Sequence, residues 1–159
     1  MIERSYFKDT KNATQTLSTI IQASKEDVFF YLATTEGISS WFPQLSITKE
    51  KEEAFVLFDL GDNTFEKMSL IDYQTDTYIA FEWASGKIEF QLEQEKEGTR
   101  LILKETLPLS FNAIPEDFTG WYVQMKQIKQ VSETKAVGSL DAEEIKKVRE
   151  EVKKQLLID

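Results

Sequence analysis

The 159-residue chain contains no cysteine and no histidine. Without cysteine it has no disulfide, thiolate metal site or cysteine nucleophile. Without histidine it lacks the usual general base near neutral pH, the commonest metal ligand and the centre of every Ser–His triad. Zinc chemistry is therefore disfavoured. Carboxylates, lysine, tyrosine and hydroxyl groups are what remains for catalysis, and we expect no metal, no cofactor and no identifiable catalytic residue.

An excess of positive charge is also missing. Lysine and arginine number 19 against 28 acidic residues, which gives a net charge of -9. Such a surface repels nucleic-acid phosphates and anionic membranes. No apolar run approaches the roughly 18 residues of a membrane-spanning helix, and residues 1–10 contain no apolar core of a signal peptide. We expect no nucleic-acid partner, no membrane insertion and a cytoplasmic location.

Hydrophobic residues make up 41% of the chain and aromatic residues 12%, which is enough to bury a core. The length predicts one domain. Glycine and proline are scarce, at six and three residues, so no linker is evident. We interpret residues 1–13 as a polar lead-in, residues 14–137 as the domain, and residues 138–159 as an additional C-terminal helix.

The order of predicted elements indicates an α+β fold. β-Branched residues predict a strand over 14–22. Ser24 then caps a first helix that Gly37 stops, and residues 38–42 form a second short helix. About six antiparallel strands follow between residues 45 and 107, with a period of two. A long amphipathic helix covers 115–136, and a final helix covers 141–157. This order predicts a helix-grip fold, in which a curved antiparallel sheet of about six to seven strands wraps on the long helix.

Several motifs resemble one known superfamily. They are Ser24-Lys25-Glu26-Asp27-Val28-Phe29, Trp41-Phe42-Pro43, Phe81-Glu82-Trp83, Gly98-Thr99-Arg100-Leu101 and Gly120-Trp121. In this order and spacing they resemble the START-like (SRPBCC) superfamily, and within it the branch named for the activator of heat-shock-protein-90 ATPase. The resemblance covers about residues 14 to 136. It implies an apolar cavity under the long helix that binds lipids, sterols, polyketides or other aromatic molecules.

Alternation along the strands predicts which side chains face that space. In strand 87–93 the inward set is Ile88, Phe90 and Leu92. In strand 99–107 it is Leu101, Leu103, Glu105 and Leu107, and in strand 77–83 it is Ile79, Phe81 and Trp83. The inward faces of strands 55–60 and 64–73 stay unassigned. The expected ligand-binding residues are Trp41, Phe81, Trp83, Phe90, Leu103, Glu105, Phe118, Trp121, Tyr122 and Met125.

Glu105 is the most distinctive of these residues, because it stands in an otherwise apolar inward row. A buried carboxylate is costly unless it is paired or protonated. We interpret it either as a polar anchor for a ligand with a raised pKa, or as a wet residue at the cavity mouth. Aromatic residues at helical spacing are also typical of ordinary core packing, so both interpretations of the aromatic set stay open.

Three hypotheses for function follow. The first is a non-catalytic binding protein for an apolar, lipid-like or aromatic small molecule. The second is a protein-interaction or co-chaperone-like regulatory module, since the surface is acidic and a helix extends the domain. The third is a cyclase or hydrolase of the same fold, which would use Glu105 or Tyr122. Oligomeric state, monomer or homodimer, stays open.

Overall fold

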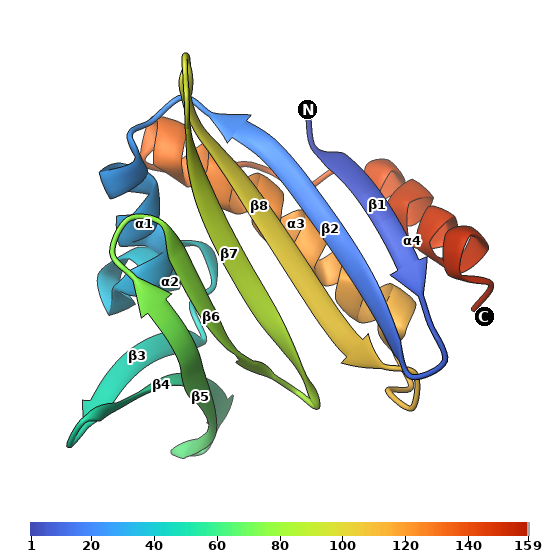
Figure 1. Cartoon of the computed structure of the whole chain (residues 1–159), viewed down its shortest axis with the longest axis horizontal. Helices are drawn as coiled ribbons and strands as arrows, with labels where there is room; N and C mark the ends of the chain where they lie inside the picture. Colours follow the sequence, from blue (N-terminus) through green and yellow to red (C-terminus); the bar gives the residue numbers. More distant parts are fainter. Residues whose placement is uncertain (159) are drawn as a thin grey trace.

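A computed structural model describes residues 1–158 as one sheet and four helices (Figure 1). The elements in chain order are β1 (Glu3–Lys8), β2 (Asn12–Ile21), α1 (Lys25–Ala33), α2 (Thr35–Trp41), β3 (Leu45–Glu50), β4 (Glu53–Gly61), β5 (Thr64–Gln74), β6 (Tyr78–Trp83), β7 (Gly86–Glu95), β8 (Gly98–Pro108), α3 (Ile114–Thr134) and α4 (Ala142–Leu156). The α+β fold with a long helix behind a curved sheet confirms the predicted architecture.

The eight strands form a single antiparallel sheet in the order β1-β2-β8-β7-β6-β5-β4-β3. The sheet curves around α3, and α1 and α2 cover one end of it (Figure 1). Bulges between Asp59 and Gly61 and between Leu70 and Asp72 interrupt the pairing of β5 with its neighbours. Bulges increase local twist, so they help the β3–β5 end to fold over toward the helix.

The prediction for residues 1–13 is wrong in one respect, because this segment contains a regular strand. β1 pairs with β2 from Glu3↔Ser18 to Lys8↔Ala13 and forms the sheet edge. The strand is short and mostly charged or exposed, which is how edge strands avoid aggregation. The same features make it look like a loop in sequence. It raises the strand number from the predicted six or seven to eight.

The junction between α1 and α2 also differs from expectation. Ser24 caps α1 as predicted, since its Oγ accepts from the Asp27 amide at 3.1 Å. Gly37, however, does not stop α1. Thr34 ends that helix and caps α2, accepting from the Gly37 amide at 3.0 Å. A Cβ atom at Gly37 would lie 2.1 Å from the Phe30 carbonyl oxygen, so this glycine is needed for the close approach of the two helices.

Helix α3 forms the centre of the core. Its buried face presents Phe118, Trp121, Met125 and Ile128 to the sheet. Pro115 stands in its first turn, where a missing amide hydrogen costs nothing. Lys135, in the left-handed conformation, ends it three residues before Gly138, where the sequence predicted the stop.

Helix α4 packs against α3 and β1 through Val148, Val152 and Leu156. Asp141 caps it, accepting from the amides of Glu143 and Glu144 at 3.1 and 3.3 Å. No helix in residues 1–158 has the length and hydropathy to cross a membrane.

Candidate functional site

The space between α3 and the sheet is occupied by an aromatic cluster. We define it as Trp41, Phe42, Phe58, Phe81, Trp83, Phe90 and Trp121. Trp121 lies at its centre, with ring centroids of five other members between 5.0 Å (Trp83) and 6.4 Å (Phe81) away. Most of these pairs are tilted or edge-on, the arrangements that aromatic quadrupoles favour. In this structure the rings therefore fill the space between α3 and the sheet by packing on one another.

The cluster combines deeply buried and half-buried rings. Trp41, Phe81, Phe90 and Trp121 are buried, whereas Phe42, Phe58 and Trp83 keep part of their surface accessible. The Trp41 indole donates to the Tyr31 carbonyl at 2.8 Å, which fixes it in the core. The Trp83 indole donates to Asp117 at 3.1 Å, in the first turn of α3. The half-buried rings thus mark the side on which the cluster approaches solvent.

Glu105 lies inward, as strand alternation predicted, and is fully buried. Its Oε1 accepts from the Gln15 amide at 2.9 Å. The Gln15 Nε2 also donates to the Phe118 carbonyl at 2.8 Å, which ties the sheet to α3. Two oxygens in this arrangement, Gln15 Oε1 and Glu105 Oε2, have no hydrogen-bond partner among the described residues.

Burial raises the pKa of Glu105 well above its usual 4.5. The neighbouring Asp117 raises this pKa further, because its carboxylate repels a charged Glu105 and favours the protonated acid. Glu105 Oε2 has no hydrogen-bond partner in residues 1–158, so Asp117 acts on it as a nearby charge. The amide of Gln15 lowers the pKa, but its effect is the smallest of these. The raised pKa favours the neutral form of Glu105, which donates as well as accepts.

Gln15 and Tyr6 are polar residues of this region that the sequence did not identify. The register pairs Tyr6 with Gln15 and Gln15 with Glu105, so the three form a polar row across β1, β2 and β8. The Tyr6 ring stacks on Phe118 at 6.5 Å, and its hydroxyl is buried without a partner. Burial raises the pKa of Tyr6 to about 12. Three of the five buried polar side-chain atoms without partners in residues 1–158 belong to this row.

The other predicted site residues fall into two groups. Phe118, Leu103 and Met125 are buried in the core beside the polar row and the aromatic cluster. Tyr122 is separated from them, although it follows Trp121 in sequence, because consecutive helix positions point about 100° apart. It lies on the side of α3 that faces β1 and α4, with the Arg4 guanidinium 5.4 Å from its ring centre.

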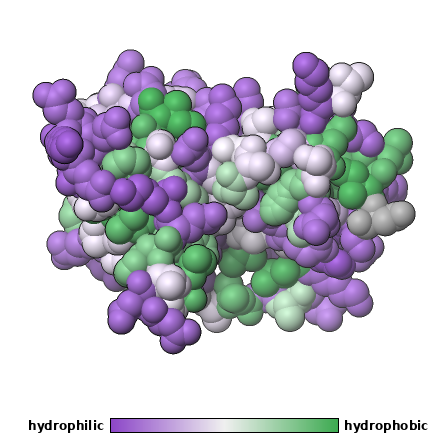
Figure 2. Space-filling view, turned by 90° about the horizontal axis from the view of Figure 1, so that it is seen from below, coloured by the Kyte–Doolittle hydropathy of each residue, from purple (hydrophilic) through white to green (hydrophobic). Residues whose placement is uncertain are grey.

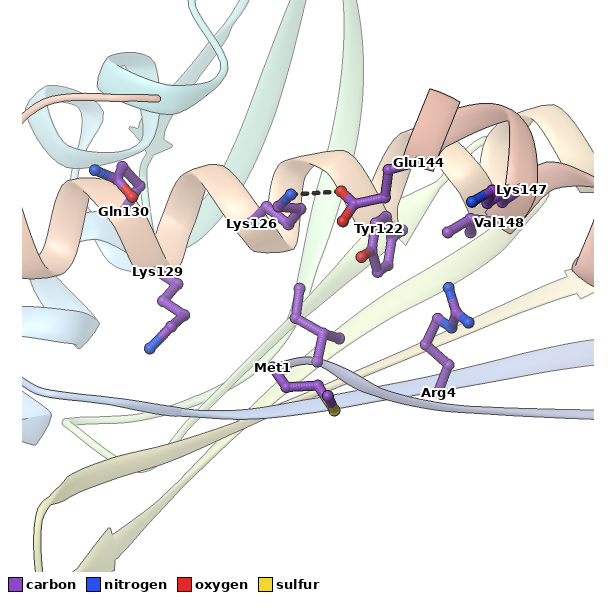
Figure 3. A pocket seen from close by; sticks show the side chains of 10 residues that line it. Met1, Arg4, Tyr122, Lys126, Lys129, Gln130, Glu144, Lys147 and Val148 are labelled. Atoms are coloured by element: carbon purple, nitrogen blue, oxygen red, sulfur yellow. Dashed lines mark hydrogen bonds and ion pairs between the residues drawn. The ribbon is translucent and has the colours of Figure 1, made fainter. Parts of the chain in front are cut away.

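Tyr122 lines a hollow of about 620 Å³ between β1, α3 and α4, which we call the flank hollow (Figure 3). Its lining residues are Met1, Ile2, Arg4, Tyr122, Lys126, Lys129, Gln130, Glu144, Lys147 and Val148. Lys126 and Glu144 form an ion pair across it, from α3 to α4 (Figure 3). The volume lies within the range of small-molecule sites. The described residues include no group of three or more acidic side chains placed to hold a metal ion.

The face seen from below carries several separate hydrophobic patches, with hydrophilic residues between and around them (Figure 2). This face includes the lower ends of the strands in Figure 1.

The sequence matches no protein-family model and no curated protein. Solved structures do match. A conserved protein of unknown function from Enterococcus faecalis, EF2215, has a TM-score of 0.85 at 27% identity, covering 96% of this chain and 92% of that one. CalU16 from Micromonospora echinospora has a TM-score of 0.70 at 16% identity, covering 99% and 96%. The Aha1 dimer from Colwellia psychrerythraea has a TM-score of 0.64 at 17% identity, covering 76% and 96%.

The chain has the helix-grip fold. The START-like superfamily suggested by the motifs and its heat-shock-protein-90 ATPase activator branch both stay predictions. The Aha1 match covers 76% of the chain and the CalU16 match 99%. The likeness at these identities concerns the fold, so function must be argued from the chain's own residues.

Proposed function

We propose that this protein is a non-catalytic binding protein for an apolar, lipid-like or aromatic small molecule that carries a hydrogen-bonding group. The ligand would lie between α3 and the sheet. Its proposed contacts are Trp41, Phe81, Trp83, Phe90, Leu103, Glu105, Phe118, Trp121 and Met125, whereas Tyr122 is left out because it lies on the other side of α3. The observation that carries the proposal is the pair of buried oxygens without partners, Gln15 Oε1 and Glu105 Oε2, beside apolar side chains.

These two oxygens have complementary chemistry. A neutral Glu105 can donate from Oε2, and Gln15 Oε1 can accept. A ligand hydroxyl, or a water in its place, could accept from one and donate to the other. Nearly all buried polar atoms in proteins have such partners. An unpaired one costs about 1–3 kcal/mol, so an occupant that satisfies both oxygens gains binding free energy.

A ligand can enter the space between α3 and the sheet only if side chains move, because the aromatic cluster is packed in this structure. The half-buried ring of Trp83 is the most suitable gate. It contacts Trp121 at 5.0 Å and is held to α3 by one hydrogen bond to Asp117. Rotation of this ring breaks that bond and exposes the Trp121 face. Side-chain rearrangements of this kind commonly accompany binding.

A titration of the isotope-labelled protein with planar polyphenols, sterols and lipids tests the proposal. The indole signals of Trp83 and Trp121 should shift together and saturably for one chemical class. Glu105→Gln keeps the shape of the neutral acid but replaces its O–H donor by an amide, so it should alter affinity for hydroxyl-bearing ligands. Glu97→Gln, in the exposed turn before β8, is the matched control. Absence of any shift at high micromolar concentration would contradict the proposal.

A second candidate function is assembly with another copy or another protein. One structural neighbour is described as a dimer, which supports a test of whether this chain forms a homodimer. Sedimentation of the intact chain across a hundredfold range of concentration would decide between monomer and homodimer. The enzyme hypothesis has less support, since Glu105 lies beside Asp117 in the core whereas Tyr122 lines the flank hollow.

A further inference from the structure

The flank hollow is separate from the aromatic cluster. Arg4 and two neighbours come from the first residues of the chain, four lining residues come from α3, and Glu144, Lys147 and Val148 come from α4. None of the rings of the aromatic cluster lines it. β1 and α4 both lie at the sheet edge beside α3, away from α1 and α2 (Figure 1). The hollow exists because β1 and α4 extend beyond the rest of the sheet and α3 on that side.

The hollow concentrates positive charge in an acidic protein. Its lining has four cationic side chains, Arg4, Lys126, Lys129 and Lys147, and one carboxylate, Glu144. The lining therefore carries a net charge of +3, while the whole chain carries -9. Two acids outside the lining offset part of this charge, because Glu151 pairs with Arg4 and Glu133 pairs with Lys129.

One end of the hollow retains free hydrogen-bonding capacity. Arg4 and Lys147 both line the hollow, and Figure 3 draws both on the side where Val148 lies. Lys147 forms no ion pair with any residue from 1 to 158. Arg4 bonds Glu151 through one terminal nitrogen, and a guanidinium has five N–H donors. This end can therefore bind a further anionic group.

Polar and apolar side chains share the rest of the lining. Lys126, Lys129, Gln130 and Glu144 make up its polar part. Val148 and Tyr122 are buried, with 2% and 7% of their surface exposed. Ile2 and the flexible thioether of Met1 stay accessible, so these two residues supply the apolar surface of the hollow. A cationic lining next to this apolar surface matches a molecule with an acidic head and a hydrocarbon tail.

We infer that the flank hollow binds an amphiphile with a single anionic head group, a carboxylate or a phosphate monoester, whose tail lies on Met1 and Ile2. The head group bonds Lys147 and Arg4. This site is independent of the ligand site proposed above between α3 and the sheet, and either proposal can be correct when the other is wrong. A chain with charge -9 repels anions in general, so the local reversal of charge at this hollow selects where they bind.

Decanoate below its micelle concentration tests the inference, with calorimetry for affinity and amide and side-chain NMR signals for location. Decanol and acetate carry the tail or the head group alone. We expect decanoate to bind more tightly than either, and to shift signals of Arg4, Tyr122 and Lys147 while the Trp83 and Trp121 indoles stay in place. Decyl phosphate, which has the same tail as decanol, distinguishes the two head groups. Tighter binding of decanoate or of decyl phosphate than of decanol supports the site and names its head group.

Two lysines adjacent in α4 provide a matched pair of variants. Lys147→Gln removes the unpaired lining cation and should weaken decanoate binding about three- to fivefold, as expected for one exposed ion pair. Lys146→Gln removes the same charge from an exposed position outside the lining and should leave affinity unchanged. Ile2→Ser should weaken binding of decanoate and leave acetate unaffected. Affinity for decanoate and decyl phosphate no higher than for decanol, equal effects of the two lysine variants, or shifts confined to Trp83 and Trp121 would overturn the inference.

Discussion

The burial of Glu105 makes a specific prediction about the pH dependence of stability. An acid whose pKa is raised in the folded state keeps its proton on folding, while the unfolded chain loses it above about pH 4.5. Unfolding then releases a proton. The free energy of unfolding therefore falls as pH rises, from about 4.5 until the folded pKa is reached, by at most about 1.4 kcal/mol per pH unit.

Glu105→Gln removes this dependence, because the amide copies the neutral acid at every pH. It can accept from Gln15 at Oε1 and donate toward Asp117 from Nε2. At pH 4 the variant and the parent should have nearly equal stability. Above about pH 4.5 the variant should become increasingly more stable than the parent as pH rises, by at most about 1.4 kcal/mol per pH unit until the folded pKa is reached, so the difference should be larger at pH 5.5 and 7 than at pH 4. Urea denaturation at the three pH values measures the difference.

The comparison is between two proteins at each pH, so the other titrating groups cancel. This matters because Glu133 and Glu116, whose pKa values are lowered, make stability rise with pH and would mask Glu105 in the parent alone. Glu97→Gln, exposed in a turn, should give no pH-dependent difference. A stability difference between Glu105→Gln and the parent that stays constant from pH 4 to 7 would refute the neutral, buried state assigned to Glu105.

Three further predictions concern packing, and urea denaturation measures each. Gly120→Ala should stabilise the protein by about 1 kcal/mol, since the new Cβ meets nothing within 4 Å on the exposed face of α3. Gly37→Ala should cost about 1–3 kcal/mol, because its Cβ would collide with the Phe30 carbonyl. Equal effects of the two substitutions on stability would contradict this reasoning. Tyr6→Phe removes a buried hydroxyl without a partner and should change stability by under about 0.5 kcal/mol or raise it, so a larger loss would indicate a hidden partner. Trp121→Ala should lower the free energy of unfolding by about 3–5 kcal/mol. A smaller loss would mean that the aromatic cluster is not tightly packed.

The parts of the fold that could be predicted are those in which the local pattern and the tertiary environment agree. Strict alternation in β8 placed Leu103 and Glu105 inward, and both are buried. Helical spacing of Phe118, Trp121 and Met125 predicted the buried face of α3. These patterns are strong because one face of each element contacts the core and the other contacts water.

The parts that could not be predicted depend on contacts between distant segments. Gln15 stands in a strand rich in β-branched residues, and its role appears only when β2 pairs with β8, 90 positions later. β1 has the composition of a loop and is ordered by pairing with β2. Tyr122 follows the same helical pattern as its neighbours, and the packing of α4 decides that it lines a different space. No local signal in the sequence marks these three residues or segments.

The two proposed sites depend on opposite sides of one helix. The side chains of Trp121 and Met125 face the sheet. Those of Tyr122 and Lys126, each one position further along α3, face β1 and α4. The first side is filled by packed aromatic rings, so a ligand there must displace aromatic contacts and is selected by shape and hydrogen bonding. The second side is open and charged, so a ligand there needs no rearrangement and is selected by its anionic head group. Because no cluster ring lines the hollow, occupancy of one site imposes no direct steric cost on the other.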